Sequence, residues 1–272
     1  SSPVKLVGIL YHPQLQKARD LANRLGELLA TQGVSSWQCS AWEEDKARSQ
    51  VNGSDLVLSI GGDGTILHIA HVSAPAKVPI LGINSGKLGF ITELSADEIP
   101  ANLIELLKNS WIEERAMLEA CLEDRKISAL NDVVLRSTAV RLLSIEAKID
   151  GEVLTTYRAD GVIIATATGS TGYSLAAGGP ILHSQSRDII LQPISCHLGL
   201  GQALVLPPQT IIELRVLGQD KAIVSFDGQV NLPLSQDQNV RVMLGPYVAK
   251  FLRLRHPNYF YSSLWEKLKG RR

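Results

Sequence analysis

The chain has 272 residues, of which 45% are hydrophobic and 20% charged, and its 27 basic and 27 acidic side chains leave no net formal charge. This composition is typical of a globular protein with one large or two modest domains, and it argues against a nucleic-acid-binding surface or a membrane-surface helix. No apolar stretch approaches the roughly 18 residues of a membrane span, and the three cysteines form no Cys-x-x-Cys pair. We therefore expect a cytoplasmic protein without a disulfide framework.

The first third of the chain alternates predicted strands with predicted helices. Strand-length apolar runs lie at residues 4–11, 37–42, 56–60 and 79–83. Apolar side chains recur at helical spacing over residues 18–29, and Gly33 follows as a helix end. Ser95 and Glu98 form a capping box at the start of a predicted helix that runs to Lys108. This alternation predicts an open, mostly parallel α/β sheet, with ligands at the carboxyl ends of its strands.

The segment Gly61-Gly62-Asp63-Gly64-Thr65 lies between the predicted strand at 56–60 and a helix-like run at 65–70. Glycines at such a point let a phosphate approach the backbone and the positive end of the helix. A carboxylate there repels phosphate, so a role in the reaction explains Asp63 better than a role in binding the phosphate does. A carboxylate beside bound phosphates can accept the proton of an attacking hydroxyl during phosphoryl transfer. An Asp-Gly turn is the simpler alternative, but it requires neither Gly61 nor Gly62.

After about Trp111 the pattern changes to short strands separated by turns. Asp150-Gly151 predicts a hairpin, while Pro207-Pro208 and Gly245-Pro246 punctuate the strands. The predicted strands lie at residues 145–149, 153–157, 162–166, 189–191, 203–206, 211–216, 223–226, 240–244 and 248–254. A short helix is predicted at residues 261–268.

These patterns predict an α/β plus all-β fold with a tight junction between two domains. An N-terminal α/β sheet domain occupies residues 1–110 and contains the glycine-rich loop. A β-sandwich-like domain follows at residues 111–255, and a C-terminal segment at 256–272 is expected to pack back on the first domain.

Two segments flank the predicted strand at residues 162–166. Arg158-Ala159-Asp160-Gly161 precedes it, and the run from Thr168 to Ala176 (TGSTGYSLA) follows it. Hydroxyl side chains interleaved with glycine supply O–H and N–H donors, and Tyr173 offers a flat face for a ring. This loop suits a nucleotide ribose, base or phosphate, although a Gly/Ser/Thr-rich turn explains the composition about equally well.

Other motifs are weaker in isolation. Asn131-Asp132 can accept hydrogen bonds from both hydroxyls of a ribose, but alone it is better explained as a turn at a strand edge. Asp227-Gly228-Gln229 first indicates a hairpin turn. The segment from Gly82 to Lys87 is one residue too short for a Walker A loop. His68 and His71 share a helix face without HExxH spacing or a nearby third ligand, so we predict no protein-bound metal.

Taken together, these segments resemble a bacterial-type NAD kinase of the ATP-NAD kinase family. The matching residues occur in the family's order along nearly the whole chain: Gly61 to Thr65, Asn84 to Phe90 (NSGKLGF), Asn131-Asp132, Arg158 to Gly161, Thr168 to Ser174, Ala177 to Pro180 (AGGP) and Asp227 to Gln229. The glycine-carboxylate loop alone is shared with lipid kinases and phosphofructokinases of the same superfamily. The Thr-Gly-Ser-Thr block together with Asn131-Asp132 narrows the resemblance to NAD kinase.

The resemblance implies transfer of the γ-phosphoryl group of ATP to the 2′-hydroxyl of the adenosine ribose of NAD, which gives NADP. It implies that Asp63 is the catalytic proton acceptor. The implied ATP-phosphate loop consists of Gly61, Gly62, Gly64 and Thr65. The implied NAD-binding residues are Asp63, Gly64, His68, Phe90, Asn131, Asp132, Arg141, Arg158, Asp160, Thr171, Gly172, Tyr173, Ser174, Leu175, Ala176 and Gln229. The chain departs from the family at Asp132, where Glu is usual, and at Gly172, where Ala is usual.

The resemblance also implies a divalent cation, Mg²⁺, that arrives with ATP rather than in a dedicated protein cage. The implied partners are NAD and ATP as substrates, with no nucleic acid and no membrane, in a homodimer or homotetramer. The alternatives are a lipid or sugar kinase of the same superfamily and a non-catalytic dinucleotide-sensing module, which would not need Asp63. The sequence leaves open ATP against polyphosphate as donor and NAD against NADH as acceptor.

Overall fold

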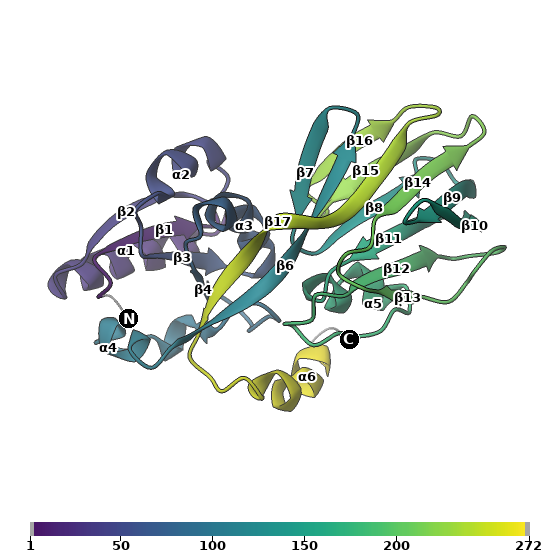
Figure 1. Ribbon diagram of the computed structural model, residues 1–272. Helices are drawn as coiled ribbons and strands as arrows, with labels where there is room; N and C mark the ends of the chain where they lie inside the picture. The colour runs from purple at the N-terminus through teal and green to yellow at the C-terminus, as the bar shows by residue number, and fades with distance from the viewer. Residues whose placement is uncertain (1–2, 270–272) are drawn as a thin grey trace. The chain divides into compact units, whose positions relative to one another are not determined.

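The computed structural model describes residues 3–269, and the chain divides into two compact units (Figure 1). The first unit comprises Ser1–Glu114 and Val248–Arg272, and the second comprises Arg115–Tyr247. The division falls within two long strands, β6 (Trp111–Leu122) and β17 (Asn239–Arg253), so each strand contributes residues to both units. No helix in the described part of the chain is long and apolar enough to cross a membrane.

The first unit is built on a sheet with the strand order β2-β1-β3-β4, in which neighbouring strands run parallel. Its strands are β1 (Leu6–Tyr11), β2 (Ser35–Ser40), β3 (Leu56–Gly61), β4 (Ile80–Asn84) and the two-residue β5 (Leu94–Ser95). Its α-helices are α1 (Gln16–Thr31), α2 (Glu44–Val51), α3 (Asp63–Ala76), α4 (Leu103–Leu107) and α6 (Tyr259–Lys269). The predicted open, mostly parallel α/β sheet is confirmed.

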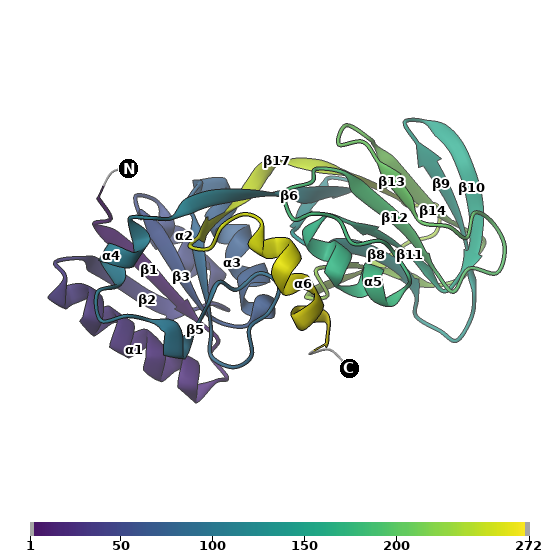
Figure 2. The same cartoon turned by 90° about the horizontal axis from the view of Figure 1, so that it is seen from below.

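Helices cover both faces of this sheet, which explains why β3 and β4 are buried along their whole length. Figures 1 and 2 show α1 and α4 on one face and α2 and α3 on the other. A Cβ atom on Gly82 of β4 would lie 2.8 Å from Ile66 Cδ1 of α3 and 3.0 Å from the backbone Cα of Thr92, so a side chain there would require its neighbours to shift. Because β1, β3 and β4 are parallel, the loops that follow them lie at one edge of the sheet.

The predicted helix from Ser95 to Lys108 is wrong as one continuous element. The capping box forms as expected, but it starts a 3₁₀ helix (η1, Ala96–Glu98) of a single turn. Ile99 then adopts an extended conformation with ψ of 116°, because the ring of Pro100 disfavours helical geometry in the residue before it. The chain resumes a helix only at Leu103, with Asn102 as the N-cap.

The second unit is a sandwich of two mainly antiparallel sheets, as predicted. One sheet has the order β10-β9-β14-β17, with β6 paired to β17 and β7 to β6, and the other has the order β13-β12-β11-β8-β15-β16. The strands not yet bounded are β7 (Arg125–Ala129), β8 (Asp132–Ser137), β9 (Leu143–Ile149), β10 (Glu152–Ala159), β11 (Gly161–Ala165), β12 (Ile189–Ile194), β13 (Leu204–Leu206), β14 (Ile212–Leu217), β15 (Ala222–Phe226) and β16 (Val230–Leu234). Apolar side chains of both sheets form one core between them.

Two features of the second half differ from the sequence prediction. Gly245-Pro246 does not interrupt a strand, since β17 is continuous, and its pairing with β14 ends at Val242, before the proline that lacks an N–H. The chain also returns to the first unit at Val248 rather than after residue 255, because the last part of β17 pairs with β4 through Phe251 and Ile80. The predicted C-terminal helix is confirmed as α6.

Candidate active site

The glycine-rich loop joins β3 directly to α3 at the carboxyl edge of the parallel sheet. Gly61 ends the strand, Gly62 is the N-cap, and Asp63 is the first helical residue. A Cβ atom on Gly61 would lie 2.2 Å from Thr65 Oγ1 and 3.2 Å from the Cβ of His12, so only glycine fits there. The loop therefore brings the N-terminus of α3, which favours anions, to the edge where the predicted phosphate site lies.

The carboxylate of Asp63 is held by the backbone of the loop that follows β4. Asp63 Oδ2 accepts a hydrogen bond from the N–H of Phe90 at 2.8 Å, while Oδ1 accepts from Ile91 at 3.1 Å and from Thr92 at 3.3 Å. These bonds occupy three of the about four lone-pair positions of a carboxylate, so room remains for one further donor. The structure thus brings the Gly61–Thr65 motif and the Asn84–Phe90 motif together.

Gly89 makes this arrangement possible. A Cβ atom at this position would lie 2.3 to 2.6 Å from the carboxylate atoms of Asp63, closer than real contacts allow. The N–H of Gly89 donates to Thr92 Oγ1 at 2.9 Å, which closes the turn around the carboxylate. The glycine of this motif is therefore explained by the close approach of Asp63.

A hollow of about 550 Å³ lies beside the glycine loop in the first unit. It is lined by Gly61, Gly62, the segment from Gln14 to Lys17 and the segment from Asn84 to Lys87. The N-terminus of α1 opens into it, since the N-cap Leu15 provides no side-chain cap and the first turn contains no acidic residue. Backbone N–H groups and the side chains of Lys17 and Lys87 make this hollow suitable for a chain of phosphates.

Sequence reasoning did not include residues 14–17 in the site. A signal was present, because β1, the loop after it and α1 repeat the strand–loop–helix order of β3 and α3. In a parallel sheet the two loops must lie at the same edge. Without glycines, however, the first loop lacks the composition that indicates phosphate binding.

His68 and Phe90 also lie in the first unit. The ring of His68 on α3 stacks on Trp42, with centroids 4.0 Å apart, and Trp42 contacts His12 at 4.7 Å. The backbone of Phe90 binds Asp63, and its side chain is partly exposed. Thr65 is buried, and its Oγ1 has no hydrogen-bond partner among residues 3–269, while Gly64 is exposed.

The second unit has two hollows that share the side chains of Arg136 and Tyr173. The first has a volume of about 250 Å³ and is lined by Asn131, Asp132, Val134, Arg136, Tyr173, Ser225, Asp227 and Gly228. The second has a volume of about 430 Å³ and is lined by Arg136, Ser137, Ala139, Val140, Arg141, Leu142, Asp160, Tyr173 and Ile194. Five predicted NAD-binding residues from four separate places in the sequence therefore line adjoining hollows: Asn131, Asp132, Arg141, Asp160 and Tyr173.

Asp227 shapes the first of these hollows from the turn between β15 and β16. It adopts a left-handed conformation with φ of 53°, as the predicted hairpin turn requires. Its carboxylate accepts hydrogen bonds from the N–H groups of Leu130 at 2.8 Å, Asn131 at 2.7 Å and Asp132 at 3.2 Å. The sequence indicated the turn but gave no sign that its carboxylate holds the Asn131-Asp132 backbone.

Asp132 is the most perturbed carboxyl group of this site. It is only 6% exposed, and burial together with the adjacent Asp227 carboxylate raises the pKa of Asp132 to about 7. Beside it, Asn131 Oδ1 is buried with no hydrogen-bond partner in the described part of the chain. A buried acceptor without a partner is costly, so this atom is available to a ligand donor.

The remaining predicted NAD-binding residues of the second unit are not among the residues that line these hollows. Within Thr171–Ala176, Tyr173 lines the hollows. The 3₁₀ helix η2 (Thr168–Thr171) ends at the first residue of this segment, and the short helix α5 (Tyr173–Ala176) follows Gly172. Ser174 is buried, and its Oγ has no partner among the described residues. The guanidinium of Arg158 donates to Ser144 Oγ at 2.9 Å. Gln229 closes the hairpin turn by donating its N–H to Phe226.

Arg136 is a lining residue that sequence reasoning missed. It lies on β8 with Asp132 and Val134, at alternate positions that share one face of the strand. The period of two placed Arg136 beside the predicted Asp132, and it is the signal that would have identified this residue.

The amino-acid sequence matches known families along most of its length. It matches the ATP-NAD kinase N-terminal domain over residues 7–111 and the ATP-NAD kinase C-terminal domain over residues 130–254. The chain belongs to the ATP-NAD kinase family. An NAD kinase of Dehalococcoides mccartyi is 44% identical, with 98% of this chain and 96% of that protein aligned. An NAD kinase of Chloroflexus aurantiacus is 36% identical, with 97% of this chain and 98% of that protein aligned.

Two solved structures show the same fold as this NAD kinase. An NAD kinase from Archaeoglobus fulgidus in complex with ATP has a TM-score of 0.78 at 26% identity, covering 97% of this chain and 98% of that one. A yeast NADH kinase complexed with NADH has a TM-score of 0.80 at 24% identity, covering 99% of this chain and 89% of that one. Among residues 3–269, no group of three or more His, Cys, Asp or Glu side chains is arranged to hold a metal ion.

The raised pKa of Asp132 makes the stability of this NAD kinase depend on pH. Between pH 4 and pH 7 the folded state keeps the proton of Asp132, whereas the unfolded state releases it because an ordinary Asp has a pKa of about 4. The contribution of this proton to the free energy of unfolding is therefore complete below pH 4 and is lost as the pH rises through 7. Relative to Asp132→Asn, the free energy of unfolding of the wild type should fall by roughly 2 kcal/mol between pH 5 and pH 8. Urea denaturation of both proteins across this range measures the difference. A pH-independent difference would contradict the prediction.

The contact between Gly89 and Asp63 predicts a loss of activity in Gly89→Ala. The added methyl group must displace the carboxylate or the turn, so the rate of NADP formation should fall at least about tenfold. Gly26→Ala in α1 is a matched control, since its Cβ would meet neighbours only at 3.8 Å or more. Steady-state kinetics of both variants make the comparison, and equal activities would exclude a role for this close approach.

Proposed function

We propose that this NAD kinase transfers the γ-phosphoryl group of ATP to the 2′-hydroxyl of the adenosine ribose of NAD, with Asp63 as the proton acceptor. One observation carries the role of Asp63: its carboxylate is fixed by three backbone N–H groups beside the glycine loop at the carboxyl edge of the sheet. A fixed carboxylate with one free acceptor position is suited to taking a proton in a defined direction.

The chemistry explains why such a group is needed. A ribose hydroxyl is a weak nucleophile, and general-base assistance contributes about 10²- to 10⁴-fold to such reactions. In the proposed step the 2′-oxygen forms a bond to the γ-phosphorus while its proton passes to the carboxylate of Asp63. The bond from the γ-phosphorus to the bridging oxygen breaks, and ADP leaves with that electron pair.

We assign the donor phosphates to the 550 Å³ hollow of the first unit. Gly61 and Gly62 permit close backbone approach, Gly64 and Thr65 lie in the first turn of α3, and Lys17 and Lys87 add positive charge. The ATP complex of the Archaeoglobus fulgidus relative supports ATP as donor. Mg²⁺ would enter as part of the ATP complex and neutralise charge on the transferred phosphoryl group.

We assign NAD to the hollows of the second unit. Asn131 and Asp132 supply oxygen acceptors for ribose hydroxyls, and Tyr173 supplies a ring face. Asp160 lines the adjoining hollow, and the family resemblance implies that it contacts the nicotinamide end. Arg136 and Arg141 line the same hollows and add positive charge for the pyrophosphate. We retain the further NAD contacts that the family resemblance implies: Asp63, Gly64, His68, Phe90, Arg158, Thr171, Gly172, Ser174, Leu175, Ala176 and Gln229.

We also propose that the protein is a cytoplasmic homodimer or homotetramer. The support is the resemblance to bacterial-type NAD kinases, together with a composition that carries no net formal charge and no long apolar stretch. Sedimentation velocity of the purified protein distinguishes the dimer from the tetramer, and a monomer would contradict the proposal.

The role of Asp63 predicts the behaviour of Asp63→Asn. An amide cannot accept the proton, so turnover should fall at least about a hundredfold while NAD still binds. The assay incubates each protein with NAD, ATP and Mg²⁺ and measures NADP. Near-normal turnover of the variant would remove Asp63 from the base role. Wild-type protein that binds NAD without forming NADP would instead favour a dinucleotide-sensing module.

A further inference from the structure

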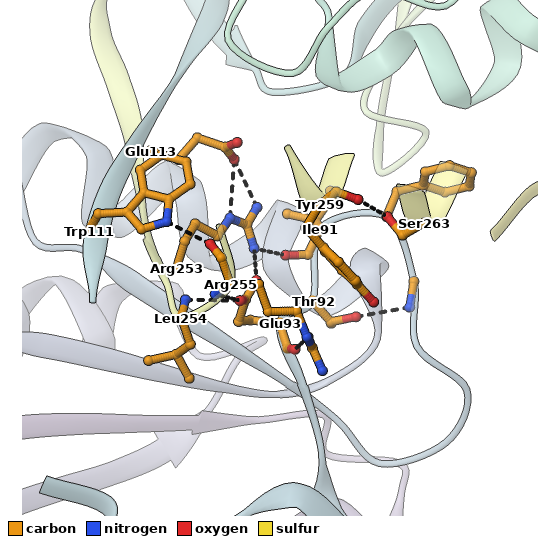
Figure 3. Close-up of polar contacts among 12 residues, drawn as sticks. Ile91, Thr92, Glu93, Trp111, Glu113, Arg253, Leu254, Arg255, Tyr259 and Ser263 are labelled. Carbon is orange, nitrogen blue, oxygen red and sulfur yellow. Dashed lines mark hydrogen bonds and ion pairs between the residues drawn. The ribbon is translucent and has the colours of Figure 1, made fainter. Parts of the chain in front are cut away.

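A cluster of three buried charged side chains lies within the first unit, and none of the three is among the residues proposed to bind substrates. Arg253 at the end of β17, Glu93 before β5 and Glu113 in β6 are each 6% exposed or less. The guanidinium donates through Nη1 to Glu93 Oε2 at 3.2 Å, and through Nε and Nη2 to Glu113 Oε1 at 3.2 and 2.9 Å (Figure 3). Arg253 thus joins three segments that are distant in the sequence.

Further bonds fix the same two segments against each other. Glu93 Oε1 accepts from the backbone N–H groups of Leu254 at 2.9 Å and Arg255 at 3.1 Å. The guanidinium of Arg255 donates to the carbonyl of Glu93 and forms an ion pair with Glu98 at 2.6 Å. Trp111 Nε1 donates to the carbonyl of Arg255 at 2.8 Å. Residues 91–93 and 253–255 are therefore held together by several hydrogen bonds, some to side-chain and some to backbone acceptors.

Stability alone is a weak explanation for this cluster. Buried ion pairs are often no more stabilising than apolar side chains of similar volume, because the cost of removing the charges from water offsets their attraction. What the cluster does provide is fixed geometry, because a planar guanidinium donates in set directions.

This geometry positions the peptide unit between Ile91 and Thr92. Arg253 Nη1 donates to the carbonyl of Ile91 at 2.7 Å, and the N–H of the same peptide unit, on Thr92, donates to Asp63 Oδ1 at 3.3 Å. In a trans peptide the C=O and N–H bonds lie in one plane and point in opposite directions. Arg253 and Asp63 therefore bind opposite edges of one rigid plane, and a rotation of that plane changes both contacts.

We propose that Arg253 is a positioning residue for phosphoryl transfer. By holding the Ile91 carbonyl, it sets the peptide plane whose N–H, on Thr92, binds the carboxylate of Asp63 beside the N–H groups of Phe90 and Ile91. This inference rests on the proposed role of Asp63 as proton acceptor. Arg253 does not touch the reacting atoms, and its effect on the reaction passes through the loop and Asp63.

The test is a double-mutant cycle with Arg253→Lys and Asp63→Asn. Lysine keeps the positive charge between the two glutamates, but a single ammonium cannot reproduce the four bonds of the guanidinium. In the wild-type background, Arg253→Lys should lower kcat for NADP formation about tenfold to a hundredfold, with the KM for NAD changed by less than about threefold. In the Asp63→Asn background it should lower kcat by less than about threefold, because the group that it positions no longer acts as a base.

Wild type, the two single variants and the double variant together distinguish a failure of the positioning role of Arg253 from a failure of the base role of Asp63. If Arg253→Lys lowers kcat by the same factor in both backgrounds, the positioning role is overturned and the base role of Asp63 remains. Near-normal turnover of Asp63→Asn alone overturns the base role and this inference with it. Unchanged kcat in Arg253→Lys also overturns the inference.

Glu113→Gln is the matched control for loss of buried charge. Its amide oxygen can keep both bonds from Arg253, and the contact of Arg253 with Ile91 stays in place, so kcat should remain within about threefold of wild type. Thermal unfolding midpoints are measured for every variant. An equal fall of kcat in Glu113→Gln and Arg253→Lys would show a merely structural effect and overturn the proposal.

A second variant covers the case in which Arg253→Lys does not fold. Glu93→Gln can keep its oxygen on the N–H groups of Leu254 and Arg255, and it then presents an amide N–H to the Nη1 donor of Arg253. This unfavourable contact shifts the group that holds Ile91 while Arg253 itself is retained. The double-mutant cycle is then made with Glu93→Gln and Asp63→Asn. Glu93→Gln should lower kcat in the wild-type background but by less than about threefold in the Asp63→Asn background, and an equal factor in both would overturn the positioning role.

Discussion

The hydrogen bonds between Asp63 and the backbone of residues 90–92 are the constraint on which the first unit's site depends. They require a glycine at position 89, because the carboxylate occupies the space of a side chain there. They also require that the loops after β3 and β4 lie at one edge of the sheet, which parallel strands ensure. A sheet geometry is thus converted into a fixed direction for one carboxylate.

The second unit uses a carboxylate in the same way for a different purpose. Asp227 binds the N–H groups of residues 130–132, and this fixes the backbone that presents Asn131 and Asp132 to the hollow. Two carboxylates then lie close together in a buried place, so the pKa of Asp132 rises. Burial is the larger cause of this raised pKa, and the turn between β15 and β16 adds the second cause by holding the Asp227 carboxylate beside β8.

The sequence identified the motifs and the kind of fold because these depend on local chemistry. Glycines around Asp63, alternating strands and helices before Trp111, and short strands with turns after it each have a direct physical cause in the chain. Local signals failed where two of them competed. The capping box at Ser95 predicted a long helix, but Pro100 ended it after one turn. The strand β6 was not predicted, because charged residues such as Glu113 interrupt its apolar pattern. In the structure the side chain of Glu113 is buried and paired with Arg253.

Amino-acid order by itself determined the glycine loop, the strand and helix pattern and the resemblance to NAD kinases. Tertiary structure alone decided which groups bind the carboxylates: residues 90–92 for Asp63, and Arg253 for Glu93 and Glu113. It also placed Arg136 and Tyr173 in the same hollows. The reason is that backbone N–H groups have no sequence signature, and contacts between residues 160 positions apart are set by strand pairing rather than by neighbours in the chain.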